Sequence, residues 1–227
     1  MPGIEKTPIV TEAIAGVAGS PRIRLALFCS FYRGYYLLHE CLLGASSRLV
    51  EVVGVATDDP TQSYVSPGRR LWSYPHEAWE ETMVADLAAR HGISCHRGRV
   101  KTPEFRERFQ QEWRPDLVIC GTFGQLIDEP LFGYPRLGFY NTHPCRGPQW
   151  PSPYAGPNPF QMMIDEGQPD LQIALHRVDE HFDAGGMVAL SPPMAIPPGA
   201  GVIDLHKITG PQVAQFVARE LPRLIAA

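Results

Sequence analysis

The chain has 227 residues, which is enough for one domain with a small extension or for two small domains. A hydrophobic fraction of 44% allows a sizeable core, and no apolar run reaches the roughly 20 residues that span a bilayer. A net charge of −4 without a dense cluster of Lys and Arg argues against a nucleic-acid partner. The five cysteines are scattered, and residues 1–20 lack the pattern of a signal peptide. We therefore expect a cytoplasmic protein with reduced thiols and no nucleic-acid or membrane partner.

Apolar runs typical of buried strands alternate with helical patterns from Ile23 onwards. The preceding residues, 1–21, predict an arm with a short helix at 10–17. The expected strands of the first part are 23–29, 50–57, 93–95, 117–120 and 137–141. The expected helices are 35–43, 77–91 and 103–112. This alternation predicts an α/β fold with a mostly parallel sheet and helices on both faces, and it places active groups beyond the carboxyl ends of the strands.

A proline-rich segment interrupts this pattern, with six prolines between residues 144 and 159. Proline at this density excludes regular structure, so the segment is either an ordered loop that faces a ligand or a linker. The elements expected after it are a helix at 160–166, strands at 171–178 and 187–190, and a closing helix from Pro211. The expected division is an arm 1–21, a main domain 22–190 and a short C-terminal extension 191–227.

Groups able to move protons gather at the ends of two apolar strands. Asn141 and His143 are two residues apart at one strand end, so their side chains point the same way. Asp183 precedes a chain reversal at Ala184-Gly185-Gly186, and His176 lies seven positions before it. An amide or imidazole can donate to a carbonyl oxygen that gains negative charge, and a carboxylate can accept a nucleophile's proton. This set suits acyl transfer to an amine without a nucleophilic Ser or Cys.

Each of these residues also has an ordinary structural interpretation when it is taken alone. Asn141 can tie down a strand end, His143 can be a loop histidine, and Asp183 can satisfy backbone donors in a turn. His176 can be a hydrogen-bonded core histidine. A metal site of His176, His181 and Asp183 lacks known ligand spacing, so no metal is expected.

A few other side chains have two open interpretations. Trp72 and Tyr74 either stack on a substrate ring or fill a loop. Arg33 and Arg146 either hold a substrate carboxylate or phosphate or form surface salt bridges. Cys145 lies beside His143 in sequence, and a packed thiol is favoured there over a nucleophile.

The two polar strand ends resemble the motifs of the folate-dependent formyltransferase family, over about residues 23–190. That family has an Asn-x-His-Pro motif, which is matched from Asn141 to Pro144, and a His-x6-Asp-x-Gly motif, which is matched from His176 to Gly185. The resemblance implies a Rossmann-like catalytic domain with 10-formyltetrahydrofolate as formyl donor. It also implies residues of a folate-side loop: Cys120, Gly121, Phe123, Gly124, Gln125, Leu126 and Ile127.

The same resemblance implies roles for the polar residues. Asn141 and His143 would polarise the formyl oxygen, and His176, from its position seven residues before Asp183, could support either His143 or Asp183. Asp183 would manage protons between the attacking amine and the departing N10 of the folate.

Departures from the family's patterns narrow the expected acceptor. Phosphoribosylglycinamide formyltransferases carry a Gly-Ser-Asn phosphate cradle after the first strand, where this chain has 29–34, a poor nest for phosphate. Methionyl-tRNA formyltransferases carry a further RNA-binding domain, whereas 44 residues follow Asp183 here. The family's Ser-Leu-Leu-Pro is replaced by 145–150. We therefore expect a small amine, either a hydroxyornithine on the way to a siderophore or a nucleotide-linked amino sugar. Its candidate binding residues are Arg33, Arg146 and Trp150.

The expected function is N-formyl transfer to this small-molecule amine by direct attack, without a covalent enzyme intermediate. A hydrolase that releases formate from 10-formyltetrahydrofolate is an alternative with the same fold. A non-catalytic folate- or nucleotide-binding module is a third, and it is favoured if the Asn141 and Asp183 side chains lie more than about 8 Å apart. A homodimer is left open.

Overall fold

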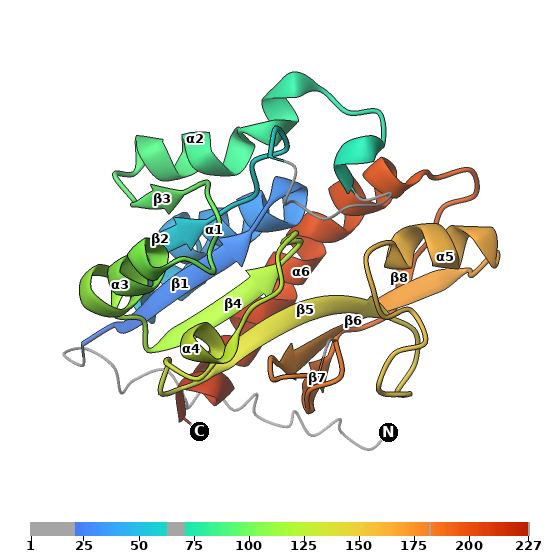
Figure 1. The fold of residues 1–227 in the computed structure, drawn as a ribbon. Coiled ribbons are helices and arrows are strands. Elements are labelled where there is room, and N and C mark those ends of the chain that lie inside the picture. The colour runs from blue at the N-terminus through green and yellow to red at the C-terminus, as the bar shows by residue number, and fades with distance from the viewer. Residues whose placement is uncertain (1–20, 63–70, 182, 227) are drawn as a thin grey trace, which may run out of the picture.

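Eight strands and the helices around them are seen in a computed structural model that describes residues 21–62, 71–181 and 183–226 (Figure 1). The arm expected at 1–21, with its short helix, lies outside the described residues apart from Pro21. The strands are β1 (Ile23–Cys29), β2 (Val50–Ala56), β3 (Cys95–His96), β4 (Leu117–Gly121), β5 (Phe139–Cys145), β6 (Asp170–Arg177), β7 (Met187–Leu190) and β8 (Met194–Ala195). The α-helices are α1 (Phe31–Leu43), α2 (Met83–Arg90), α3 (Pro103–Glu107), α4 (Glu129–Phe132), α5 (Pro159–Asp165) and α6 (Val202–Ala226). The shorter turns are η1 (Ala45–Arg48), η2 (Leu71–Ser73), η3 (Ala78–Glu81) and a π-helical η4 (Arg108–Trp113).

The sheet has the order β3-β2-β1-β4-β5-β6-β7, with β8 paired to β6. The pairings from β3 to β5 are parallel, whereas β6 runs antiparallel to β5, β7 and β8. The order reverses between β1 and β4, and ligands of such sheets bind beyond the carboxyl ends of the strands at that reversal. The predicted Rossmann-like, mostly parallel sheet is therefore confirmed.

Both faces of the sheet are covered by helices, because the central strands are apolar on both sides. Leu25 and Leu27 of β1 pack in one core cluster with residues of α1, α2 and α6. The alternate residue Phe28 packs in a second cluster with Phe105 and Phe109, from α3 and η4. The two clusters lie on opposite faces, since successive side chains of a strand point to opposite sides.

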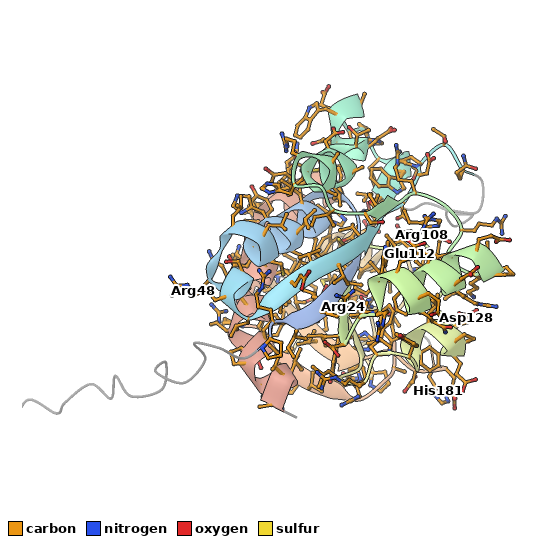
Figure 2. The ribbon with its side chains drawn as sticks, turned by 90° about the vertical axis from the view of Figure 1, so that its left-hand side faces the viewer. Arg24, Arg48, Arg108, Glu112, Asp128 and His181 are labelled. Carbon is orange, nitrogen blue, oxygen red and sulfur yellow. The ribbon has the colours of Figure 1, made fainter. Side chains whose placement is uncertain are left out.

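The far end of η4 is tied to the first strand by Arg24. Its Nη2 donates to the backbone carbonyl oxygens of Glu112 and Trp113, at 3.2 and 2.7 Å. Figure 2 shows Arg24 beside this end of η4. The carbonyl groups at a helix end lack partners within the helix, so this arginine supplies them.

The closing helix begins earlier than the sequence predicted. The expectation of a start at Pro211 is wrong, because α6 begins at Val202 and contains Pro211 in its interior. Leu205 and Thr209 are buried, and the core that they enter outweighs the hydrogen bond that proline removes. Gly210 allows α6 to cross α1 closely, since a Cβ there would lie 3.2 Å from the Tyr32 carbonyl oxygen.

Several other boundaries also differ from the expected ones. The helix expected at 35–43 begins at Phe31, and the one expected at 77–91 is divided into η3 and α2. The expected C-terminal extension, 191–227, shares its core with β1, because α6 contributes to the same apolar cluster. In the described part of the chain, no helix is both long and apolar enough to cross a membrane.

Candidate active site

A cavity of about 650 Å³ lies beside the carboxyl end of β4 and the second half of β5. All four predicted catalytic residues line it: Asn141, His143, His176 and Asp183. The predicted folate-side residues also line it, with the exception of Gly121. The position of the cavity agrees with the strand reversal between β1 and β4.

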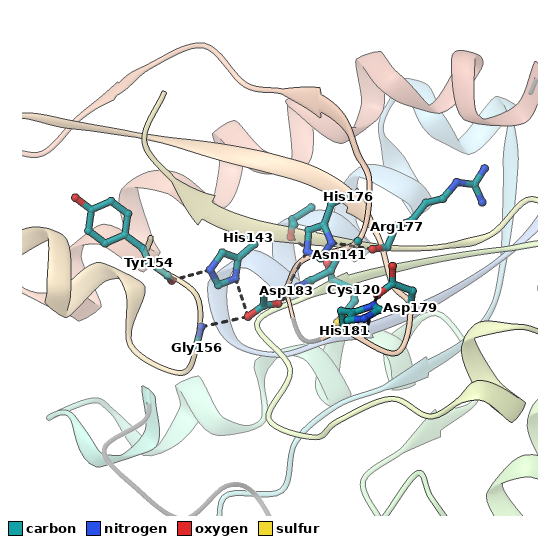
Figure 3. A network of polar contacts seen from close by, with 12 residues as sticks. Cys120, Asn141, His143, Tyr154, Gly156, His176, Arg177, Asp179, His181 and Asp183 are labelled. Carbon is teal, nitrogen blue, oxygen red and sulfur yellow. Dashed lines mark hydrogen bonds and ion pairs between the residues drawn. The ribbon is translucent and has the colours of Figure 1, made fainter. Parts of the chain in front are cut away.

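The Asp183 carboxylate is the centre of the polar groups in this cavity (Figure 3). Asn141 Nδ2 donates to its Oδ1 at 3.1 Å, and the Gly156 backbone N–H donates to its Oδ2 at 3.3 Å. His143 Nδ1 lies 3.4 Å from Oδ2, and His176 Nε2 lies 3.9 Å from Oδ1. The Asp183 side chain is 8% exposed, so these contacts act where water screens them little.

The antiparallel pairing of β5 with β6 brings two of these residues together. Asn141 is the register partner of His176, and the loop from β6 to β7 then returns Asp183 to the same place. Asp183 has a φ of +48°, a region that Asp tolerates better than most residues. Gly185 has no room for a side chain, because a Cβ there would lie 2.0 Å from the Arg177 carbonyl oxygen.

His143 is oriented by the proline-rich loop. Its Nε2 lies 2.9 Å from the Tyr154 carbonyl oxygen, so Nε2 carries the proton and donates, and Nδ1 faces Asp183. Burial lowers the pKa of His143, while the Asp183 carboxylate opposes that shift. An Nδ1 lone pair and an ionised carboxylate repel each other, so their 3.4 Å contact is favourable only when the pair holds one proton between these two atoms. The two groups are therefore arranged to exchange one proton.

His176 is supported from behind by Trp150. The His176 Nδ1–H donates to the Arg177 carbonyl oxygen at 2.8 Å, and the Trp150 ring lies 4.8 Å from the imidazole ring. Trp150 Nε1 donates to the Gly185 carbonyl oxygen at 2.8 Å, which ties it to the loop that carries Asp183. Burial lowers the pKa of His176. Trp150, predicted to bind the substrate, is not among the residues that line the cavity.

The folate-side segment is fixed by hydrogen bonds to its backbone and side chains. The Gly124 N–H donates to both carboxylate oxygens of Asp58, at 3.0 and 2.9 Å. Gln125 donates to the Gly98 carbonyl oxygen and accepts from the Val100 N–H. The apolar side chains of Phe123, Leu126 and Ile127 in this segment line the cavity, as is common in sites that bind ring systems.

Two predicted residues of the site, Gly121 and Arg146, do not line the cavity. Gly121 is close-packed, since a Cβ there would lie 2.9 Å from Thr142 Oγ1. Arg146 is 42% exposed and pairs with Asp170 at 3.5 Å, so the structure does not bring it to the cavity. Its position one residue past β5 places it beyond the groups that face inward.

Of the remaining aromatic and basic candidates, Trp72 and Arg33 line the cavity and Tyr74 does not. Trp72 lines the cavity and packs edge-on against Phe31, whereas Tyr74 is buried outside it. Arg33 lines the cavity, is 3% exposed, and donates from Nη1 to the Thr142 carbonyl oxygen at 2.8 Å.

Sequence reasoning missed Asp58, Tyr154 and Gly156. Asp58 could have been found, because it follows the expected strand 50–57 and its end meets those of the neighbouring parallel strands. Tyr154 and Gly156 act through backbone groups of an irregular loop, and residue type gives no signal for such contacts. Among the described residues, no group of three or more His, Cys, Asp and Glu side chains is arranged to hold a metal ion.

An amide, two imidazoles and a carboxylate in a cleft of a doubly wound sheet are groups that suit acyl transfer. A family model described as "Formyl transferase" matches residues 36–204. This chain belongs to the formyl transferase family, which confirms the resemblance inferred from the motifs.

Relatives with assigned names include methionyl-tRNA formyltransferases. That of Syntrophomonas wolfei is 28% identical over 176 residues, which cover 77% of this chain and 51% of the relative. That of Thermotoga maritima is 30% identical over 126 residues, which cover 56% of this chain and 39% of the relative. The chain thus spans about half or less of the length of these relatives.

Solved structures show the same fold at lower identity. Glycinamide ribonucleotide transformylase 1 from Geobacillus kaustophilus gives a TM-score of 0.61 at 18% identity, covering 90% of this chain and 97% of that one. A formyltetrahydrofolate deformylase from Pseudomonas syringae pv. tomato gives 0.63 at 17% identity, covering 89% of this chain and 61% of that one.

Proposed function

We propose that this protein moves the formyl group of 10-formyltetrahydrofolate, the donor used in its family, to the amine of a small metabolite. The observation that carries the proposal is the set of contacts around Asp183, with Asn141 at 3.1 Å and His143 at 3.4 Å. A non-catalytic module would be favoured by side chains more than about 8 Å apart, and the observed contact argues against it.

The arrangement supports direct attack of the amine on the formyl carbon. The formyl oxygen gains negative charge as the new C–N bond forms, and the second Asn141 Nδ2–H, which has no partner among the described residues, can donate to it. His143 can support the same oxygen only in its imidazolium form, because the Nδ1 of the neutral ring carries a lone pair and no proton to donate. Asp183 accepts the proton of the attacking nitrogen, and a proton is returned to N10 as the old C–N bond breaks.

The cavity supports a small acceptor. Its volume of about 650 Å³ suits two small molecules in contact rather than a large surface. The segment 29–34 lacks the Gly-Ser-Asn cradle, which disfavours phosphoribosylglycinamide. We therefore place a hydroxyornithine-type siderophore precursor or a nucleotide-linked amino sugar first among acceptors.

The test is an assay of tetrahydrofolate release with 10-formyltetrahydrofolate and a panel of acceptors: hydroxyornithine, nucleotide-linked amino sugars, phosphoribosylglycinamide and methionyl-tRNA. We expect turnover with a small amine. Formate release without any acceptor would favour the hydrolase alternative, and turnover with methionyl-tRNA alone would contradict the small acceptor.

Asn141→Ala and Asp183→Asn should each lower kcat by about 10² to 10⁴, the range for loss of an oxyanion donor or a proton-transfer group. Cys145→Ala is the matched control, because its buried thiol lies outside the cavity and no covalent intermediate is required. Circular dichroism should show all three variants folded. Near-normal rates in both site variants would contradict the mechanism.

A further inference from the structure

Arg33 is a buried cation at the wall of the cavity without a carboxylate partner in the described part of the chain. Nη1 donates to a backbone oxygen, while Nε and Nη2 have no hydrogen-bond partner among the described residues. None of the ion pairs found there includes Arg33. Burial lowers the pKa of the guanidinium to about 10, which still leaves it charged at neutral pH. An uncompensated buried charge is costly, so a binding role has to be considered.

The same wall holds two aromatic rings from other helices. The Arg33 guanidinium carbon lies 5.7 Å from the centre of the Phe160 ring, on α5. The His206 ring, on α6, lies 4.9 Å from the Phe160 ring and is 8% exposed. His206 Nδ1 also lacks a hydrogen-bond partner within the described residues. Three segments distant in sequence thus present a cation and an imidazole to one part of the cavity.

The negative charges of the cavity lie on other segments. Its lining carboxylates are Asp58, Asp128, Glu129, Asp179, Glu180 and Asp183, from the end of β2, the start of α4 and the loop after β6. Among the described lining residues, those contributed by α1, η2, α5 and α6 include no Asp or Glu. An anion bound against this part of the cavity would therefore be attracted by the Arg33 charge, and α1, η2, α5 and α6 contribute no carboxylate to the lining that would repel it.

We propose that the wall formed by Arg33, Phe160 and His206 is an anion subsite, and that the acceptor amine carries a carboxylate or phosphate held against it. Arginine suits this task because its planar group offers several donors to a carboxylate or phosphate. The claim that this anion belongs to the acceptor amine rests on the proposed function. The claim that an anion binds here does not.

The experiment uses three small amines that differ in one group: phosphoethanolamine, β-alanine and ethanolamine. Their binding to the full chain is measured by titration calorimetry in the presence of 5-formyltetrahydrofolate. We expect an anionic probe to bind at least about tenfold more tightly than ethanolamine, as for a hydrogen bond to a charged group. Preference for phosphoethanolamine indicates a phosphate, and preference for β-alanine indicates a carboxylate.

Arg33→Met should abolish the preference for the anion, and Arg33→Lys should keep part of it. Lys101→Met is the matched control, because it removes one positive charge from another part of the same cavity lining and should keep the preference. Circular dichroism and retained 5-formyltetrahydrofolate binding report that each variant is folded. Should Arg33→Met not fold, Arg33→Gln takes its place.

Equal binding of all three probes, or no binding of either anionic one, would overturn the proposal. An anion preference that survives in Arg33→Met, or that disappears in Lys101→Met as well, would do the same. These readings require no turnover, so a failure of formyl transfer in the acceptor assay is recognised separately.

Discussion

The position of Asp183 in the cavity depends on Gly185, a nearby residue without a side chain. The loop from Arg177 to Gly186 folds back so closely that the Arg177 carbonyl oxygen occupies the space of a Cβ at Gly185. A backbone carbonyl oxygen cannot rotate away from an added methyl group as the end of a flexible side chain can. The position of the carboxylate is therefore tied to the absence of a methyl group two residues further on.

Gly185→Ala should consequently lower the rate of formyl transfer by about 10² or more, because a displacement of about 1 Å at a reacting group has that effect. Gly186→Ala is the control, since a Cβ there meets no atom within 4 Å. Steady-state rates of tetrahydrofolate release measure both. Equal rates in the two variants would show that the loop adjusts without moving Asp183.

Trp150 is expected to act through His176 and the same loop. Trp150→Phe keeps an aromatic ring behind His176 and removes the hydrogen bond to Gly185. We expect kcat to fall by about tenfold with KM for the folate nearly unchanged, the size of one lost hydrogen bond. Trp79→Phe, at a site that is 56% exposed, serves as control. A large rise in KM with unchanged kcat would instead indicate direct substrate contact.

The strand β2 and the helix η4 can pack closely against each other because residue 54 of the strand is glycine. Gly54 lies under the Trp113 ring, and a Cβ there would come within 2.1 Å of it. Trp113 is 2% exposed and donates from Nε1 to Ser94 Oγ at 3.1 Å, so the ring has little freedom to move.

Gly54→Ala should therefore destabilise the fold by about 1–3 kcal/mol, the usual cost of overpacking a core. The measurement is the midpoint of urea unfolding, followed by Trp fluorescence and by circular dichroism. Gly201→Ala is the control, because its nearest contact would be an ordinary 3.6 Å. An unchanged midpoint in Gly54→Ala would mean that the ring can shift at little cost.

The sequence predicted most strands correctly because buried parallel strands are continuous apolar runs, as in Ile23–Cys29 and Leu117–Gly121. It misplaced the start of α6 at Pro211, because the burial of Leu205, which holds the first turns of this helix in the core, depends on contacts distant in sequence. A local sequence pattern indicates the propensity of a segment to form a helix, whereas the residues at which the helix begins and ends also depend on contacts with segments distant in sequence.

Site residues were predictable where the side chain itself carries the chemistry. They were not predictable where the contact depends on the path of the backbone. Asn141 and Asp183 stand in recognisable motifs, and the structure joins them at 3.1 Å. Trp150 and Arg146 were expected to face the substrate because they replace a family segment. Their actual partners, Gly185 and Asp170, lie on other parts of the chain, and no local pattern reveals them.

For the whole molecule, the cavity gathers histidines whose protonation opposes folding. Burial lowers the pKa of His143, His176 and His206, most strongly for His206, which lies near the Arg33 charge. His96 shifts in the same direction, again through burial. In the unfolded chain these imidazoles titrate near their ordinary value of about 6.5.

Stability should therefore decrease as pH falls below about 6.5, because the unfolded chain then binds protons that the folded chain does not. Each such histidine contributes up to about 1.4 kcal/mol per pH unit until its folded pKa is reached. The contribution is fully present above pH 6.5. Unfolding free energies from urea titrations at several pH values between about 5 and 8 measure the slope.

His206→Phe isolates one part of this slope, because phenylalanine keeps an aromatic ring beside Phe31 and Phe160 and cannot take up a proton. Its stability should depend less steeply on pH below about 6.5 than that of the wild type, while the two converge in slope above it. His39→Phe, on the exposed side of α1, is the control for replacing an imidazole by a phenyl ring away from the cavity. A His206→Phe slope equal to that of the wild type would mean that His206 takes up its proton in the folded state as readily as in the unfolded one.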